Sequence, residues 1–158
     1  MNVCELVSPE KAILPCKKVK EVESLDYFRK LYRSLIATAL KNDGVGIAAP
    51  QIGIYLKIFA AYLQEYSGWT IFFNPKYKSL KGNTVKSQEG CLTLGKDNKY
   101  NVTRYTEVLA EWEEYNLSGL AKKKRILTGL SAIIFQHETD HINGITIASK
   151  GEKIKSGG

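Results

Sequence analysis

The sequence predicts a fold of the α+β class, chiefly from the order of its elements. An amphipathic helix comes early in the chain, several strands follow, and a second helix lies near the end. The length of 158 residues suffices for one hydrophobic core, and 44% hydrophobic with 25% charged residues is typical of globular proteins. We therefore expect residues 1–158 to form a single domain, with an extended arm over residues 1–23.

Composition and charge indicate the compartment and the partners. No apolar run reaches the roughly 20 residues that cross a bilayer, and Glu5 and Glu10 interrupt any secretory segment. We therefore expect a cytoplasmic protein, or the mature form of an organellar one, with no membrane partner. The net charge of +7 can favour anionic partners. The lysines are spread along the chain, however, so we interpret the run 122–125 as solvated surface and expect a monomer without a specific nucleic-acid site.

The first helix is predicted over residues 24–41. Ser24 is a suitable N-cap, and Asp26 lies in the first turn. Apolar residues at steps of three and four give this helix one buried face; they are Leu25, Phe28, Leu31, Tyr32, Leu35 and Ala39. The pair Asp43–Gly44 then ends the helix.

Small residues dominate the next stretch, residues 44–53. Its three glycines carry no Cβ, so the backbone can approach a ligand closely. The dinucleotide-binding pattern G-x-G-x-x-G breaks at Ala49. Gln51 carries an amide that could donate a hydrogen bond into a site. The alternative interpretation is a tight turn between a helix and a strand.

Strand patterns fill the middle of the chain. Residues 55–63 and 70–77 are rich in β-branched and aromatic residues, and residues 107–115 alternate between apolar and acidic side chains. Residues 120–127 should pair back onto that strand. The polar segment 78–86 is interpreted as a hairpin or loop.

The most informative stretch is the last predicted helix, which begins after Thr128 and ends at residues 143–144. It contains both histidines of the chain, His137 and His141. At a spacing of four residues they share one helix face and can bind one metal ion. Glu138 would lie beside the metal, where it could act on a metal-bound water. The alternative is that two histidines fall four apart on an ordinary helix by chance.

An open metal site of this kind needs a third protein ligand. Ile147 stands where metzincin proteases have a third histidine, and the only acid left downstream is Glu152, near the end of the chain. The three cysteines form no C-x-x-C pair, which argues against a disulfide framework. Cys91, in a loop of small residues, is therefore the remaining candidate for a thiolate ligand.

Three separated stretches match a known pattern in order and approximate spacing. They are Gly-Val-Gly-Ile-Ala-Ala-Pro-Gln at 44–51, Glu-Gly-Cys-Leu-Thr at 89–93 and Gln-His-Glu-Thr-Asp-His-Ile-Asn-Gly at 136–144. In these motifs the sequence resembles the peptide deformylases. The resemblance implies antiparallel β-sheets around a central metal-binding helix. It also implies a minimal form of the family that lacks a long C-terminal helix, with a frayed tail over residues 148–158.

The resemblance implies a catalytic domain that removes the formyl group from the N-terminal formyl-methionine of newly made polypeptides and releases formate. Cys91, as a thiolate, would bind one divalent metal together with His137 and His141. The usual metal of the family is Fe(II), with nickel, cobalt or zinc as alternatives. The implied partners are formylated nascent peptides and the ribosome.

Further site residues follow from the same resemblance. Glu138 would pass a proton from the attacking water to the leaving amine, while the Gln51 side chain and the Leu92 backbone N–H would stabilise the oxyanion. An ion pair between Glu89 and Arg104 would support the cysteine loop. The residues implied for the substrate are Val45, Leu130, Ile133 and Ile134 around the methionine side chain, and the backbone of Val45, Gly46 and Gly90 beside the peptide. The alternative for the apolar residues is plain core packing.

The sequence departs from the family pattern near Cys91. Thr93 replaces the usual serine and keeps a hydroxyl, whereas residues 94–98 lack the usual proline and leave the family's peptide-contacting arginine without a clear counterpart. Two other functions therefore stay open: a metallo-amidase or peptidase acting on another substrate, and a non-catalytic descendant that binds peptides or the ribosome. Glu138 distinguishes them, because a binding protein has no chemical need for it.

Overall fold

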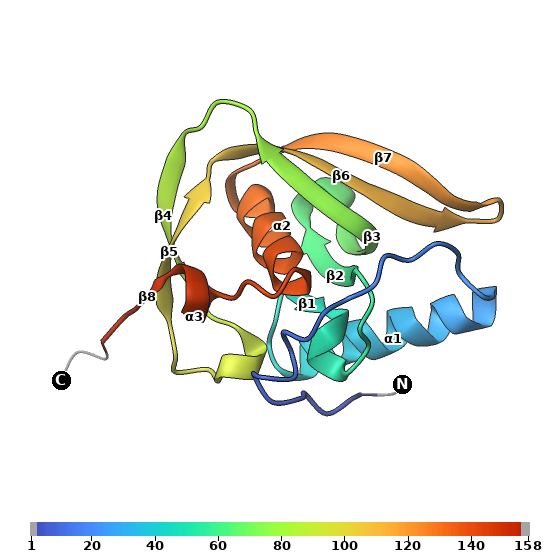
Figure 1. Cartoon of the computed structure of the whole chain (residues 1–158). Helices are drawn as coiled ribbons and strands as arrows, with labels where there is room; N and C mark the ends of the chain where they lie inside the picture. The colour runs from blue at the N-terminus through green and yellow to red at the C-terminus, as the bar shows by residue number, and fades with distance from the viewer. Residues whose placement is uncertain (1–2, 156–158) are drawn as a thin grey trace.

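The computed structural model describes residues 3–155, which form three α-helices, eight strands and three short 3-10 helices (Figure 1). The helices are α1 (Leu25–Lys41), α2 (Gly129–Ile142) and α3 (Ile147–Lys150). The strands are β1 (Gly46–Ala48), β2 (Ile58–Leu63), β3 (Gly68–Ser79), β4 (Thr84–Glu89), β5 (Tyr100–Tyr105), β6 (Glu107–Asn116), β7 (Gly119–Thr128) and β8 (Glu152–Lys153). The 3-10 helices are η1 (Ala49–Ile52), η2 (Gln64–Tyr66) and η3 (Leu92–Leu94).

The strands form two antiparallel sheets. One has five strands in the order β1-β2-β3-β6-β7, and the other has three in the order β4-β5-β8. Helix α2 contacts strands of both sheets and occupies the centre of the molecule (Figure 1). The predicted α+β class, with antiparallel sheets around a central helix, is confirmed.

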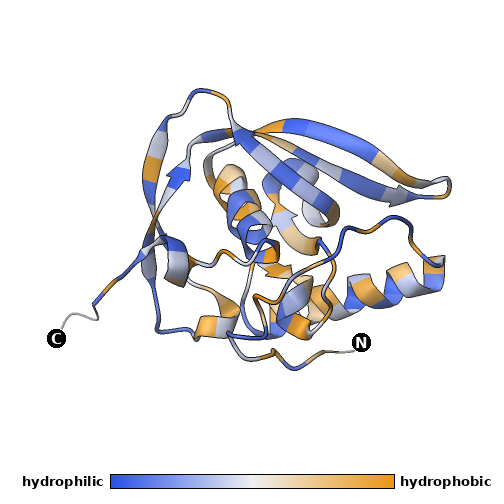
Figure 2. Ribbon diagram, in the orientation of Figure 1, coloured by the Kyte–Doolittle hydropathy of each residue, from blue (hydrophilic) through white to orange (hydrophobic). Residues whose placement is uncertain are grey.

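The five-stranded sheet has a core on each face. Successive side chains of a strand point to opposite faces, so Phe72 packs against Phe135 of α2 while Phe73 packs against Phe28 of α1. Helix α1 shows hydrophobic and hydrophilic residues in alternation, and β7 at the sheet edge is largely hydrophilic (Figure 2). The sheet thus holds α2 in a fixed place against one of its faces.

The predicted first helix is confirmed, together with its cap. The Ser24 hydroxyl accepts a hydrogen bond from the Tyr27 backbone N–H at 3.1 Å, and the helix ends at Lys41. Leu31 and Leu35 are buried, as the periodicity predicts. Two residues of the predicted face, Leu25 and Tyr32, are instead 42% and 37% exposed.

Four predicted strands are confirmed as β2, β3, β6 and β7, whereas the sequence analysis does not predict β1, β4, β5 or β8. Strand β4 carries polar side chains on both faces, and only its last residue, Glu89, is buried. Strand β5 buries Val102 and Arg104 between exposed polar residues. Neither strand shows the apolar alternation by which half-buried strands are recognised.

The end of the described chain is ordered, in contrast to the frayed tail expected from residue 148. Helix α3 is capped by Thr146, whose side chain accepts from the Ser149 N–H. Strand β8 then pairs with β5, with Glu152 opposite Asn101. The rest of the expected tail, residues 156–158, lies outside the described residues, as do residues 1–2 of the expected arm.

The N-terminal arm contains no helix or strand in its described part, residues 3–23. It is held by backbone hydrogen bonds that join Lys17 to Tyr55 and Lys57. Among the described helices of the protein, none is long and apolar enough to cross a membrane.

Candidate metal centre and active-site cleft

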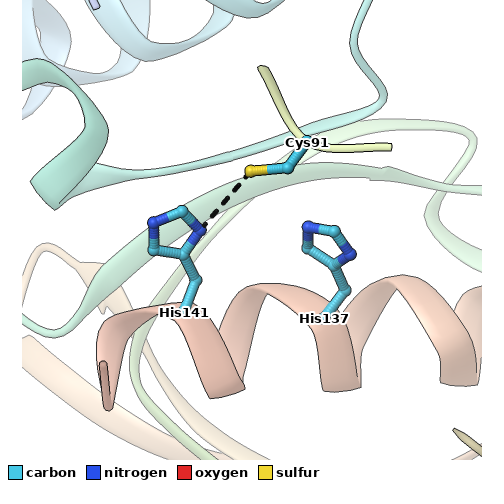
Figure 3. Close-up of side chains that lie close together, drawn as sticks. All are labelled: Cys91, His137 and His141. Atoms are coloured by element: carbon cyan, nitrogen blue, oxygen red, sulfur yellow. Dashed lines mark hydrogen bonds between the residues drawn. The ribbon is translucent and has the colours of Figure 1, made fainter. Parts of the chain in front are cut away.

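Helix α2 presents His137 and His141 to Cys91. The two imidazoles rise from consecutive turns of the helix toward the cysteine sulfur (Figure 3). The candidate ligand atoms of the three residues all lie within 4.8 Å of one another, with Cys91 Sγ at 4.0 Å from His141 Nδ1. Residues 46 positions apart in the sequence thus form one cluster of metal-binding groups.

Cys91 reaches the helix because the chain turns sharply at the end of β4. Gly90 follows the strand, and Cys91 caps η3, where its carbonyl accepts from the Leu94 N–H at 3.0 Å. A side chain at position 90 would meet Lys99 Nζ at 2.7 Å, so glycine gives room for that lysine. The cysteine itself is 8% exposed and packs with Val102 and Ile147.

The two histidines favour the thiolate form of Cys91. Burial alone would raise the pKa of the thiol, but hydrogen bonds and positive charge from His137 and His141 lower the pKa to about 5. Burial likewise disfavours the charged form of His137, while Cys91 and Glu89 raise its pKa to about 10. Thiolate is the form of cysteine that binds metals, so the protein presents Cys91 in its ligating state.

The unsatisfied atoms of the site fit a metal ion. His137 Nδ1 is engaged by Glu89 Oε1 at 2.8 Å, which leaves its Nε2 available as a ligand. His141 Nε2 is buried and has no hydrogen-bond partner among the described residues. Leaving such a group unpaired is costly, and a set of one thiolate and two imidazoles suits a divalent transition metal. The three residues therefore form a metal site.

Glu138 lies beside this cluster and against β1. Its side chain is 5% exposed, and its Oε1 has no hydrogen-bond partner within the described chain. Burial raises the pKa of the carboxyl, although the charges of His137 and His141 oppose that effect. A Cβ at Gly46 would lie 2.6 Å from Glu138 Oε2, so the carboxylate occupies the space that glycine leaves.

Gln51 is fixed from the other side of the cleft. It lies on η1, is 2% exposed, and accepts from the Ala48 backbone N–H through Oε1 at 2.9 Å. That hydrogen bond directs its Nε2 toward the site, 3.7 Å from Cys91 Sγ. Leu92 follows Cys91 as the first residue of η3 and lines the same cleft.

Nearly all the residues that the sequence analysis singled out line one cleft of about 490 Å³. Its lining includes Val45, Gly46, Gln51, Gly90, Cys91, Leu92, Leu130, Ile133, Ile134, His137 and Glu138. His141 lies deeper and is 1% exposed. Val45 and Leu130 stand at the rim, where they are 56% and 70% exposed. Exposed apolar side chains at a cleft mouth are available to a ligand.

Sequence reasoning missed other residues of the cleft. Lys96 and Lys99 belong to the lining, and Lys96 reaches across to Asp43 at 3.4 Å. Their polar loop contains no recognisable motif, so only the path of the chain after η3 reveals where these lysines lie. A cation is thus present on this wall, although the family's arginine has no clear counterpart.

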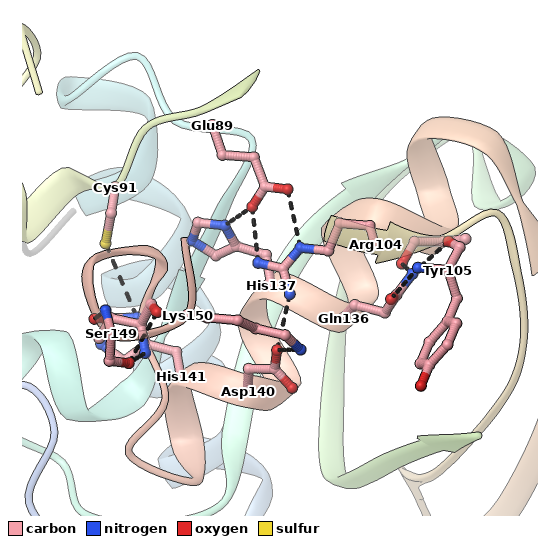
Figure 4. A network of polar contacts seen from close by, with 12 residues as sticks. Glu89, Cys91, Arg104, Tyr105, Gln136, His137, Asp140, His141, Ser149 and Lys150 are labelled. Atoms are coloured by element: carbon pink, nitrogen blue, oxygen red, sulfur yellow. Dashed lines mark hydrogen bonds and ion pairs between the residues drawn. The ribbon is translucent and has the colours of Figure 1, made fainter. Parts of the chain in front are cut away.

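Beneath His137 lies a buried network of charges (Figure 4). Arg104 donates to both oxygens of Glu89 at 2.8 and 2.9 Å, which is the ion pair that the motif pattern predicts. Hydrogen bonds and charge from His137 and Arg104 outweigh burial and lower the pKa of Glu89 to about 2. Glu89 is therefore a fixed anion, and its hydrogen bond holds the His137 ring in one orientation.

The fold and the site together define a class of protein. A buried helix carries two imidazoles four residues apart, a thiolate completes the donor set, and a carboxylate lies beside it at an open cleft; these are features of a metal-dependent hydrolase. The sequence profile described as polypeptide deformylase matches residues 5–156. The chain belongs to the polypeptide deformylase family.

Individual relatives agree with this assignment. Peptide deformylase 2 of Bacillus anthracis is 41% identical over 110 residues, a segment that covers 66% of this chain but only 58% of that relative. Peptide deformylase of Orientia tsutsugamushi is 31% identical and is matched over 98% of this chain and 90% of its own length. The crystal structure of peptide deformylase from Thermotoga maritima superposes with a TM-score of 0.81 at 26% identity, covering 95% of this chain and 98% of that one.

Proposed function

We propose that this protein is a peptide deformylase, which hydrolyses the formyl amide of an N-terminal formyl-methionine and releases formate. The observation that supports this best is the convergence of Cys91, His137, Glu138 and Gln51 on one cleft, in a chain of this family. The substrate is a new polypeptide, whose extended N-terminus can enter a cleft that is open to solvent.

Cys91, His137 and His141 hold the metal, for which we propose Fe(II). When bound, a divalent metal here lowers the pKa of water so that a nucleophile is available at neutral pH. Glu89 orients the His137 ring through its Nδ1, and the buried thiolate contributes a negative charge to the donor set. The chain would thus supply three ligands to the metal, Cys91, His137 and His141.

Glu138 is the proton carrier in this proposal. Its burial raises the carboxyl pKa above the ordinary value, which favours uptake of a proton by this group. Its position next to the ligands allows it to accept a proton from the attacking water and deliver it to the leaving amine. No other carboxyl group in the cleft is free for this, because Glu89 is committed to Arg104 and His137 and Asp43 lies at the mouth.

The oxyanion that develops on the formyl group needs preorganised donors. Gln51 Nε2 is suited to this role because the hydrogen bond from Ala48 to Oε1 fixes the amide. The backbone N–H of Leu92, at the start of η3, is the second donor in our proposal. Gln51 Nε2 lies 3.7 Å from the Cys91 sulfur, and Leu92 is the residue that follows Cys91.

The methionine side chain lies against the apolar wall of the cleft formed by Val45, Leu130, Ile133 and Ile134. Three of these come from α2, one or two turns before the histidines, so the pocket and the metal site share one rigid element. Strand β1 is an outer strand of its sheet. The peptide can therefore add along Val45 and Gly46, with Gly90 on its other side.

The wider setting follows from this substrate. We propose that residues 1–158 act as one catalytic domain, as a monomer, in the cytoplasm or in an organelle. Its partner is the formylated nascent peptide, met at the ribosome.

The assignment is tested by formate release from formyl-Met-Ala-Ser, using protein prepared anaerobically with Fe(II). Wild type should turn over, and Glu138→Ala should lose at least about 100-fold in kcat while its metal content is unchanged. Absence of turnover by fully metallated wild type would refute the proposal. Cleavage of unformylated peptides or other amides, measured as release of a free amine, would instead identify the alternative metallo-amidase or peptidase.

A further inference from the structure

Lys150, the last residue of α3, returns to the helix that carries the histidines. Its Nζ lies 2.8 Å from Oδ2 of Asp140, the residue immediately before His141 (Figure 4). The Asp140 side chain is 7% exposed and the lysine side chain is 33% exposed. The carboxylate of this ion pair is therefore buried and its ammonium is partly exposed, whereas both groups of the Lys30–Asp26 pair are exposed. The pair connects the end of the described chain to α2.

The contacts continue from Asp140 to the metal site without a break. The same Oδ2 accepts from Arg104 Nη1 at 2.8 Å, while Oδ1 accepts from the Tyr77 hydroxyl at 2.6 Å. Arg104 in turn donates two hydrogen bonds to Glu89, and Glu89 Oε1 is hydrogen-bonded to His137 Nδ1. Asp140, Arg104 and Glu89 thus connect Lys150 to the metal ligand His137. Lys150 itself does not line the cleft.

The charges of the buried residues around Asp140 indicate a specific role for Lys150. His137 must be neutral to bind a metal, so the buried groups Glu89, Arg104 and Asp140 together carry one net negative charge. A buried charge without compensation is costly, and the structure around it rearranges to reduce that cost. The ammonium of Lys150 offsets this charge within the network of Glu89, Arg104 and Asp140.

We infer that Lys150 is a positioning residue for the metal site: it neutralises the carboxylate of Asp140 and so leaves Arg104 free to hold Glu89 against His137. Without Lys150, Asp140 would draw Arg104 more strongly, and the two hydrogen bonds that fix Glu89 would weaken. The His137 ring would then be less well oriented. The inference rests on the metal site and not on the substrate, so it can fail while the deformylase assignment stands.

The test is the affinity for a divalent metal, measured with Co²⁺ or Zn²⁺ against a competing chelator. Loss of a group that orients a metal ligand typically weakens metal binding 10- to 100-fold, so Lys150→Met should weaken it about 10-fold. Lys150→Arg should restore most of the affinity. The matched control is Lys153→Met, which removes the same charge from exposed strand β8 and should bind metal as wild type does.

A double variant separates charge balance from simple loss of a contact. Lys150→Met combined with Asp140→Asn removes one charge of each sign and makes the buried group neutral again. We expect it to bind metal more tightly than Lys150→Met alone, and the Co²⁺–thiolate absorption of Cys91 should return toward that of wild type. The inference is overturned if Lys150→Met binds metal as wild type does, if Lys153→Met weakens binding equally, or if the double variant is no better than the single one.

Discussion

Because Gly46 has no side chain, the carboxylate of Glu138 can occupy the space next to it. A Cβ at this position would stand 2.6 Å from Oε2 and 3.2 Å from Cδ of Glu138, so the carboxylate must move if any side chain is introduced. We predict that Gly46→Ala lowers kcat about 100-fold, because a displacement of about 1 Å can cost that much. Metal content should be unchanged, since Glu138 is not a ligand.

The control for this prediction is Gly68→Ala. No atom lies within 4 Å of a Cβ built at Gly68, so this substitution should leave both kcat and metal content as in wild type. Full activity of Gly46→Ala would mean that Glu138 can adjust freely and would argue against a precisely held proton carrier.

Gln51 offers a second prediction at the level of a single residue. Its Oε1 satisfies the Ala48 N–H, and its Nε2 is the proposed oxyanion donor. Gln51→Leu should lower kcat by about 10² to 10³, the usual effect of losing one such donor, with a smaller change in KM. Steady-state kinetics with the formyl peptide would measure both. A loss confined to KM would assign Gln51 to substrate binding instead.

The sequence predicts the metal ligands, and the family resemblance predicts the Glu89–Arg104 pair, but neither predicts the contact of Lys150 with Asp140. Helical spacing alone places His137 and His141 on one face, and the lack of other ligands points to Cys91. Lys150 and Asp140 are only ten residues apart, yet their contact depends on the path of the chain between α2 and α3. No periodicity encodes such a path.

At the scale of elements, the junction between α3 and β8 allows a test of how closely this segment packs against β5. Gly151 joins the two, and a Cβ there would meet Asn101 O at 2.6 Å and Val102 Cγ2 at 2.8 Å. Because a backbone oxygen cannot move cheaply, we predict that Gly151→Ala separates β8 from β5 and costs about 1 to 3 kcal/mol of stability. Urea denaturation would measure that cost.

Amide exchange would locate the change predicted for Gly151→Ala. Protection should fall at the β5–β8 pair, around Asn101 and Lys153, and stay unchanged along β6–β7. Equal protection of β5 in the variant and in wild type would show that the segment accommodates a methyl group.

Two of the elements that sequence analysis predicts, α1 and β6, have one clear apolar face. Helix α1 has a cap and a stripe, and β6 alternates strictly, so both could be assigned within about two residues. Sequence analysis interprets residues 78–86 as a hairpin or loop, which includes the first half of β4; five of the six residues of β4 are exposed or partly exposed. Its position is determined by pairing with β5, which is a property of the assembled sheet.

At the scale of the whole molecule, the hydrophobic pattern of the sequence does not predict the order of the strands in the two sheets. Strands β3 and β6 are neighbours, although β4 and β5 come between them in the chain and form a separate sheet with β8. The two-sided burial of the five-stranded sheet explains why Phe72 and Phe73, adjacent in sequence, both lie in a core. Only the resemblance to a known family supplied the expectation of sheets around α2.

The buried charges make the stability of the whole molecule depend on pH. The pKa of Glu89 falls from 4.5 to about 2 on folding, because His137 and Arg104 outweigh the effect of burial. A depressed carboxyl pKa means that the unfolded chain binds the proton more readily, so Glu89 stabilises the folded state above pH 4.5. That contribution, roughly 3 kcal/mol at 1.36 kcal/mol per pKa unit, should be lost as the pH falls from about 4.5 to about 2.

The pH range over which Glu89 loses its stabilising effect can be distinguished from the range that belongs to Cys91. The stabilisation from the Cys91 thiolate is lost between the ordinary thiol pKa of 9.0 and its lowered value of about 5, at higher pH than the Glu89 window. We therefore predict that metal-free Glu89→Gln, although less stable than wild type at pH 6, loses less further stability between pH 4.5 and pH 2.5. Urea denaturation across that range would measure the slopes, and Glu10→Gln, a change in the exposed N-terminal arm, should keep the slope of wild type. Equal slopes in Glu89→Gln and wild type would mean that Glu89 is not the anion on which acid stability depends.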